Sequence, residues 1–206
     1  MQLEVQELRQ AEPPKKKTGE RALRQHIETL MDRLVKLNIG GGESGIVIQF
    51  EDPRFNNWCA KYQKFSYNPA EFKKLRAIYL AGKQVPRPWF EVPDRQLFVM
   101  ERLNGHTLEH LMKEGLKFSP SLVDEIEEIV RDFNEQFAHN DLRRDNIFLE
   151  DLRIENRVVV NGTPFLIDVE RATYNKPGEK TDEYRLVRGF FIGKIAEPID
   201  EIYRNA

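Results

Sequence analysis

The chain is most constrained by one octet, His139-Asn140-Asp141-Leu142-Arg143-Arg144-Asp145-Asn146, which an apolar run at 147–149 follows at once. A second acidic residue, Asp168, ends a strand-like apolar run at 165–167. Phosphoryl transfer uses such parts, because one aspartate orients the attacking hydroxyl while an asparagine and a second aspartate hold Mg²⁺. The octet can also arise by chance, so its weight depends on which residues precede it.

Composition limits the class of protein. The 206 residues suffice for one sizeable core or for two small lobes that share a cleft. A charged fraction of 32% is ordinary for a soluble globular protein, and a formal net charge of −2 gives no strong nucleic-acid signal. The single cysteine, Cys59, allows no intrachain disulfide. Since the sequence also shows no apolar run of membrane-spanning length and no signal-peptide core, we expect a cytoplasmic protein.

The N-terminal region divides into an arm and a helix. Residues 1–19 are polar, and we expect a solvated, flexible basic arm. Lys15–Lys17 offer an alternative role as a contact for acidic lipid, nucleic acid or a partner. Apolar residues at helical spacing then predict a helix over residues 20–36.

A glycine-rich stretch follows this helix. Gly40, Gly42 and Gly45 fit the pattern G-x-G-x-x-G, and Val47 extends it. Glycines let backbone N–H groups approach phosphate oxygens, because no Cβ is in the way. The pattern alone also fits a flexible hairpin turn or a dinucleotide-binding turn. Residues 46–50 are strand-like rather than helical, which favours a hairpin.

Lys61 lies in a strand-like run at 58–62 and is suited to bind the α- and β-phosphates of a nucleotide. The alternative is an exposed surface lysine. Asn68 and the residues after it predict a helix that ends at Gly82. Glu71 is the only acidic residue between Lys61 and Gly82, so it is the only local candidate to pair with Lys61. Its alternative role is to cap the helix.

A candidate adenine site comes next. Residues 97–101 predict a strand and residues 102–105 its connection. Such a strand end could present backbone groups to an adenine and bury its faces against apolar side chains. Met100, Glu101 and Leu103 are the residues that we expect to do so. The alternative is an ordinary strand and loop.

Two helices lead to the octet. We predict a short one over 107–113 and a longer one that begins at Ser119-Pro120. The longer helix carries an apolar stripe at Leu122, Ile126, Ile129, Val130, Phe133 and Phe137. We expect His139, which follows it, to have a structural rather than a catalytic role.

The last part of the chain contains a predicted turn between two strands and a predicted helical segment. Asn161-Gly162 predicts a turn between two strands, and this turn would fold Asn146 and Asp168 toward each other. Residues 184–199 predict a mostly helical segment interrupted at Pro198.

This ordered set of residues resembles the protein-kinase-like superfamily over about residues 34–195. The resemblance implies an α+β, two-lobed fold: a small antiparallel β-sheet lobe at 20–103 and a reduced, mostly helical lobe at 104–206. It implies ATP in the cleft with Mg²⁺, or Mn²⁺ as an alternative. By this resemblance Asp141 would be the catalytic base and Arg143 a cation that screens the phosphoryl group. Lys61 and Glu71 would form an ion pair, and Asn146 and Asp168 would bind the metal.

The chain departs from ordinary protein kinases after Asp168. Asp168-Val169-Glu170 replaces Asp-Phe-Gly, no Ala-Pro-Glu segment follows, and only 36 residues come after Glu170. We therefore expect no peptide-docking helices of a full-sized kinase. Such shortness resembles RIO-type kinases and the small kinase subunit of the KEOPS complex. The string at 167–172 is similar to one in lipopolysaccharide core-sugar kinases.

The expected function is an ATP-dependent phosphotransferase that acts on a hydroxyl, most simply that of a protein serine or threonine. The first alternative is a kinase of a lipopolysaccharide-type sugar. The second is a nucleotide-binding or ATPase subunit of a protein complex. A weak membrane-surface contact through Lys15–Lys17 would be worth only about 1 kcal/mol per lysine.

Overall fold

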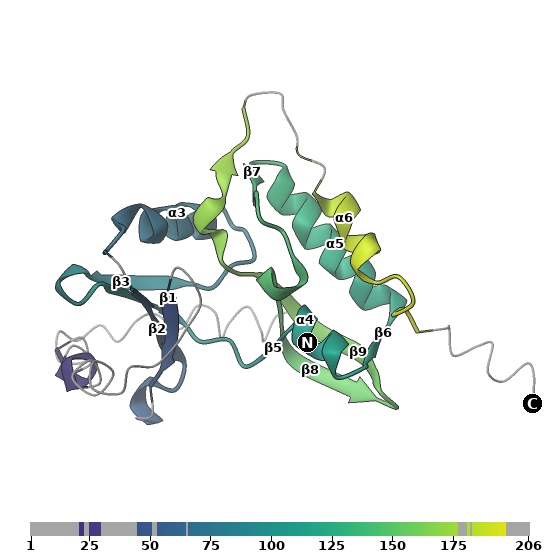
Figure 1. Cartoon of the computed structure of the whole chain (residues 1–206), viewed down its shortest axis with the longest axis horizontal. Helices are drawn as coiled ribbons and strands as arrows, with labels where there is room; N and C mark the ends of the chain where they lie inside the picture. Colours follow the sequence, from purple (N-terminus) through teal and green to yellow (C-terminus); the bar gives the residue numbers. More distant parts are fainter. Residues whose placement is uncertain are drawn as a thin grey trace, which may run out of the picture. The chain divides into compact units, whose positions relative to one another are not determined.

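The structure, a computed structural model, describes residues 21–22, 25–29, 45–50, 53–64, 66–176, 181 and 183–196 (Figure 1). The chain divides into two compact units. Unit 1 comprises residues 1–68 and 89–100, and unit 2 comprises residues 69–88 and 101–206. The domain boundaries expected from the sequence, at 19/20 and 103/104, stay predictions.

Unit 1 is built on a four-stranded sheet in the order β1-β2-β4-β3. Its strands are β1 (Gly45–Gln49), β2 (Trp58–Gln63), β3 (Pro88–Val92) and β4 (Leu97–Glu101), with 3-10 turns η1 (Pro53–Phe55) and η2 (Pro93–Arg95) between them. Strands β1 and β2 are antiparallel, so the strand-like runs that the sequence predicted are confirmed. The sequence also allows a short strand near residues 35–39, and these residues lie outside the described ones.

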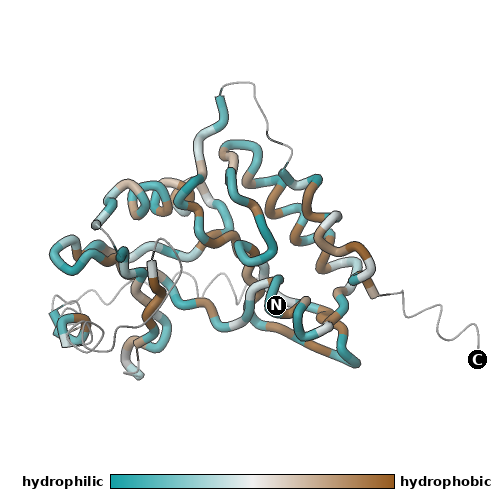
Figure 2. Tube along the Cα trace, viewed as in Figure 1, coloured by the Kyte–Doolittle hydropathy of each residue, from teal (hydrophilic) through white to brown (hydrophobic). Residues whose placement is uncertain are grey.

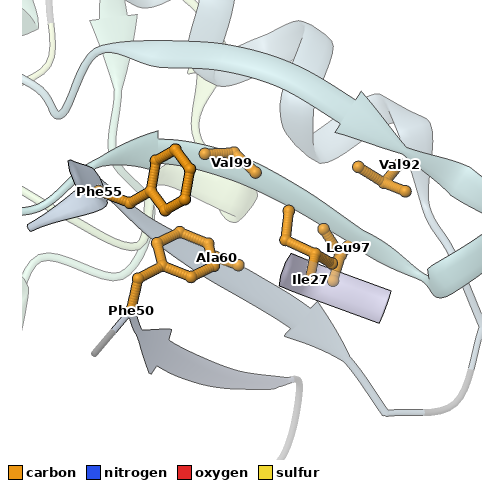
Figure 3. Packing of buried hydrophobic residues seen from close by; sticks show 7 residues of the cluster. All are labelled: Ile27, Phe50, Phe55, Ala60, Val92, Leu97 and Val99. Atoms are coloured by element: carbon orange, nitrogen blue, oxygen red, sulfur yellow. The ribbon is translucent and has the colours of Figure 1, made fainter. Parts of the chain in front are cut away.

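One hydrophobic cluster holds unit 1 together (Figure 3). The helical residues 25–29 contribute Ile27, which is 1% exposed and packs on the sheet. Burying each large apolar side chain stabilises the fold by about 1.5–3 kcal/mol. The buried members of the cluster are Ile27, Phe50, Phe55, Ala60, Val92, Leu97 and Val99.

Helix α3 (Pro69–Leu80) belongs to unit 2 and begins where the sequence predicted. Its buried apolar residues are Phe72, Leu75 and Ile78, three residues apart, so one face of the helix is covered. Its end is a Schellman motif: the Lys83 N–H donates to the Ile78 carbonyl and the Gly82 N–H to the Tyr79 carbonyl.

Three further helices form much of unit 2: α4 (Leu108–Lys113), α5 (Pro120–Asn134) and α6 (Tyr184–Phe190). Thr107 caps α4 and Ser119 caps α5, each by accepting a backbone N–H from the residue three positions later. Figure 2 shows apolar and polar stretches alternating along α5, as one buried face requires. Helix α6 lies along α5 (Figure 1). No helix in the described ranges is long and apolar enough to cross a membrane.

Unit 2 also contains a four-stranded sheet in the order β5-β8-β9-β6. Its strands are β5 (Gly105–Thr107), β8 (Ile147–Glu155), β9 (Val158–Leu166) and β6 (Lys117–Phe118). A separate pair joins β7 (Phe137–Ala138) to β10 (Thr173–Tyr174). Phe137 therefore ends up in a strand rather than on the helical stripe predicted for it. The expected α+β class is confirmed.

The predicted turn at Asn161-Gly162 is wrong. Both residues lie within β9, and the chain reverses instead at Asn156 and Arg157, whose φ angles are 47° and 64°. Two positive φ angles between paired strands form the two-residue turn that matches strand twist. Gly162 faces the irregular part of β8, where a Cβ would lie 3.1 Å from Leu152 Cδ2. A close approach, not a turn, thus accounts for this glycine.

Candidate functional site

The predicted loop runs from His139 to Asn146 between β7 and β8, and ends in the 3-10 turn η3 (Arg144–Asn146). Asn146 is 4% exposed, and its side-chain amide donates to the Asp141 backbone carbonyl at 2.8 Å. Its own backbone N–H donates to the Arg143 carbonyl at 3.0 Å. These two bonds fix the loop around Asp141.

Two arginines flank the Asp141 carboxylate. Arg143 Nε lies 3.3 Å from Asp141 Oδ1, and Arg171 Nη1 lies 3.7 Å from Asp141 Oδ2. The Asp141 side chain is 20% exposed, so it keeps access to solvent and to a ligand. Sequence reasoning placed Arg171 in a family-like string but assigned it no role. The structure places its guanidinium beside the candidate base.

Asp168 is held next to this loop. It precedes the 3-10 turn η4 (Val169–Arg171) with φ 57° and ψ 43°, a left-handed conformation that is uncommon outside glycine. The Ile167 N–H donates to the Asn146 carbonyl at 3.0 Å. His139, 1% exposed, contacts the Ile167 carbonyl through Nε2 at 3.0 Å, and since a carbonyl only accepts, Nε2 is the donor. His139 thus has the structural contact that was expected of it.

Three carboxylates gather at this point. Glu71, Asp168 and Glu170 each place a carboxylate oxygen within 4.8 Å of the others. Lys74 on α3 donates from Nζ to the Glu170 backbone carbonyl, which ties the helix to η4. Like charges so close favour a nearby cation, and hard divalent ions prefer such oxygen ligands. The Asn146 amide nitrogen is committed to Asp141, which leaves its Oδ1 for a metal. These residues therefore fit Mg²⁺.

In unit 1, Val47 on β1 lies directly opposite Lys61 on β2, so both side chains are on one face of the sheet. Lys61 is only 9% exposed, which excludes the alternative of an exposed surface lysine. A Cβ on Gly45 would lie 2.5 Å from the Tyr62 carbonyl oxygen, so Gly45 is required by packing against β2. Gly40 and Gly42 lie outside the described residues.

The candidate adenine residues differ in which groups they can offer. The Glu101 N–H donates to the Arg87 carbonyl at 2.8 Å, and the Glu101 carboxylate accepts the Arg87 N–H at 3.0 Å. Glu101 thus cannot give its N–H to an adenine. Leu103 makes no backbone hydrogen bond within the described ranges, so its N–H is the better donor. Met100 is half-buried at the end of β4.

Glu183 is a positioning residue that the sequence did not reveal. Its carboxylate accepts the His139 N–H at 2.7 Å, the Asn140 N–H at 2.8 Å and the Asn134 side-chain amide at 2.9 Å. Asn140, with φ 62°, also donates to the Arg171 carbonyl at 3.0 Å. Glu183 lies 44 residues beyond His139, and no local spacing indicates such a contact.

Three solved structures of kinases have a backbone similar to that of this chain. The backbone is similar to that of Rio2 kinase from Chaetomium thermophilum. In its complex with ADP, Mg²⁺ and phosphoaspartate, the match has a TM-score of 0.49 and 15% identity over 76% of this chain and 51% of that chain. A second structure of the same kinase gives a TM-score of 0.48 and 14% identity over 76% of this chain and 56% of that chain. A further kinase domain matches with a TM-score of 0.44 and 16% identity over 76% of this chain and 58% of that chain.

The chain thus spans about half the length of these solved chains. No family model matches it, and no curated protein matches it. We therefore base the proposed function on the residues of this chain alone.

Proposed function

We propose that this chain transfers the γ-phosphoryl group of ATP to a hydroxyl group. The observation that carries the proposal is the arrangement in unit 2 of Asp141, held by Asn146, with Asp168 fixed beside them. These residue types are the ones that phosphoryl transfer requires, since its catalysis is mostly positioning and electrostatic stabilisation.

Asp141 is the proposed base. Its half-buried carboxylate would accept a hydrogen bond from the acceptor hydroxyl and orient its oxygen for attack. Arg143 and Arg171 approach the carboxylate at 3.3 and 3.7 Å, so their positive charge is available where negative charge develops on the transferring group. Neither arginine makes a short charge-assisted bond to Asp141, which leaves guanidinium N–H donors for phosphate oxygens.

The proposed metal ligands are Asn146 Oδ1 and the Asp168 carboxylate, with Glu71 or Glu170 next to Asp168. A bound Mg²⁺ would neutralise charge on the phosphate oxygens. Two hydrogen bonds hold these ligands in place: one from the Asn146 side-chain amide to the Asp141 carbonyl, and one from the Ile167 N–H to the Asn146 carbonyl. Lys61 and the glycine-rich stretch are the proposed phosphate ligands, and the Leu103 N–H is the proposed adenine donor.

The proposed acceptor is a protein serine or threonine. A sugar hydroxyl and water, the latter in an ATPase subunit of a complex, are the alternatives carried from the sequence. The three acceptors would give different labelled products from the same ATP, so one experiment separates them.

The pure protein is incubated with γ-labelled ATP and Mg²⁺, alone and with protein and lipid-sugar fractions of a cell lysate. Label in serine or threonine supports the proposal, label in the lipid-sugar fraction supports the sugar alternative, and label only in free phosphate supports an ATPase. Asp141→Asn is the matched control, since it keeps the side-chain size. If label transfer by this variant equals that of the unchanged protein, the proposed function is wrong.

A further inference from the structure

Unit 2 contains a cavity of about 620 Å³ next to the loop of Asp141. Its ionisable lining residues are Glu109, His110, Lys113, Arg143, Arg144 and Asp145. Arg143 lines this cavity and also contacts Asp141, so a ligand in the cavity lies close to the proposed base. The proposed function uses Arg143 but leaves the rest of the cavity without a role.

The charge of the lining is positive. Three cationic side chains, Lys113, Arg143 and Arg144, stand against two carboxylates, Glu109 and Asp145, before any protonation of His110 is counted. A cavity that keeps a surplus cation attracts an anionic ligand and repels a cationic one.

The ion pairs in the cavity are loose. Lys113 Nζ lies 3.3 Å and Arg144 Nε 3.6 Å from the Glu109 carboxylate, whereas charge-assisted hydrogen bonds are about 2.7–2.9 Å long. Arg144 also donates from Nη1 to Met112 Sδ at 3.6 Å, a weak acceptor. The Glu109 carboxylate thus shows that a carboxylate fits between the two cations, while most of their N–H donors stay available.

The cavity is open to solvent. The side chains of Lys113, Arg143 and Arg144 are 72%, 58% and 46% exposed. Small-molecule sites usually bury about 70–90% of a ligand, which such an open lining does not do. An extended peptide, whose side chains enter one at a time, suits it better. Leu142 and Phe190 add apolar surface for side-chain methylene groups.

We propose that this cavity binds acidic side chains next to the acceptor serine or threonine, so that the chain selects acidic protein segments. This inference rests on the proposed function, because it names the acceptor of the same site. Arg144 and Lys113 determine the preference, and Glu109 weakens it by competing for both cations.

The test uses three short peptides with one serine flanked on both sides by glutamate, glutamine or lysine. Binding is measured by fluorescence anisotropy without ATP, and phosphorylation with labelled ATP. The glutamate peptide should bind most tightly, and Arg144→Glu and Lys113→Glu should each raise its Kd and KM at least about tenfold, as loss of one charge-assisted bond predicts. The preference should shrink as salt rises.

Two further variants keep the test independent of folding. Glu109→Gln should tighten binding of the glutamate peptide, because it removes a competing carboxylate. Arg153→Glu reverses a charge on β8 that is 71% exposed, close to the 72% of Lys113. Arg153 pairs only with Glu155 among the described residues, so this variant should leave binding unchanged.

Equal binding of the glutamate and glutamine peptides, or equal losses in Arg144→Glu and Arg153→Glu, would overturn the inference. A parallel sample contains glucose 6-phosphate as a sugar acceptor, and its phosphorylation with no binding of the glutamate peptide would also overturn the inference. If all peptides are phosphorylated equally, the proposed function stands and the acidic preference fails. If Arg144-dependent binding occurs but no label is transferred, the proposed function fails and the acidic specificity of the cavity stands.

Discussion

The side-chain amide of Asn146 donates a hydrogen bond to the backbone carbonyl of Asp141 over 2.8 Å. Because Asn146 is 4% exposed, water competes little for this bond. The bond closes the loop on itself and leaves Asn146 Oδ1 as the side-chain atom that can bind a cation. One side chain therefore both fixes the proposed base and serves as a proposed metal ligand.

Replacing Asn146 should separate these two roles. Asn146→Ala removes both the donor and the oxygen, so we expect slow turnover and a higher Mg²⁺ concentration at half-maximal rate. Asn146→Asp keeps an oxygen ligand and should retain a Mg²⁺ requirement close to that of the unchanged protein, while loss of the bond lowers the unfolding free energy by about 1–3 kcal/mol. A Mg²⁺ titration of turnover checks this, with the exposed Asn161→Ala as control. An unchanged Mg²⁺ requirement in Asn146→Ala would remove the metal role.

Arg143 and Arg144 should not be equivalent. Arg143 contacts Asp141 and Asp145, whereas Arg144 pairs with Glu109. Arg143→Ala and Arg171→Ala should each lower kcat, by roughly 10²–10³ for one lost stabilising contact. Arg144→Ala should leave kcat largely intact and act on the KM for the acceptor. Steady-state kinetics with saturating ATP separates the two effects, and equal small losses in all three variants would contradict the assignment.

Glu183 should be needed to position the loop. Glu183→Ala leaves the His139 and Asn140 N–H groups without their acceptor, which we expect to cost about 1–3 kcal/mol in total. At about 2–4 °C per kcal/mol for a chain of this size, the melting temperature falls by several degrees. Turnover should fall as well, and Glu183→Asp should restore part of it. Glu128→Ala, at an exposed position of α5, is the control. Normal turnover in a destabilised Glu183→Ala would mean that the residue only supports folding.

The sequence predicted those features that depend on local pattern. The helix starts near Thr107 and Ser119, the start of α3 and the strands β1, β2 and β4 all follow from neighbouring residues, and the structure contains them. The order of Asp141, Asn146 and Asp168 likewise indicated one site, and the hydrogen bond from Ile167 to Asn146 brings the last two together.

Features set by distant contacts were missed. Asn161-Gly162 has the composition of a turn, yet the bulge in β8 opposite Gly162 explains the glycine, and Asn156 makes the turn instead. Glu183 and Arg171 reach the site across long stretches of chain, so no spacing rule predicts them. The position of Glu170 next to Glu71 and Asp168 also depends on how α3 packs on η4.

Lys61 and Glu71 are predicted to act together on the nucleotide. Both are 9% exposed, and they belong to different units. Lys61→Ala should weaken ATP binding and slow turnover strongly, because it removes the proposed phosphate ligand. Glu71→Gln should slow turnover while helix α3 stays folded, since glutamine also serves at that capping position. ATP affinity, turnover and the melting temperature are measured together. Turnover of Glu71→Gln equal to that of the unchanged protein would make Glu71 a helix cap and no more.

The central claim is that Asp141 is the base and Asp168 a metal ligand, so binding and chemistry should separate. ATP at about 100 times its dissociation constant stabilises a protein by about 2.7 kcal/mol. At roughly 2–4 °C per kcal/mol this is a shift in melting temperature of several degrees. Asp141→Asn should keep this shift, because the proposed role of Asp141 is to contact the acceptor rather than ATP. Asp168→Asn should lose its Mg²⁺-dependent part, because the metal loses a ligand.

The decisive measurement is therefore thermal unfolding of Asp141→Asn and Asp168→Asn with and without Mg-ATP, alongside turnover of the same samples. We predict that turnover is lost in both variants and that the Mg²⁺-dependent shift is lost in Asp168→Asn alone. If ligand-free Asp141→Asn has a lower melting temperature but retains most of its turnover, then Asp141 only stabilises the loop and is not the base. Full turnover in either variant would contradict the proposed phosphotransferase.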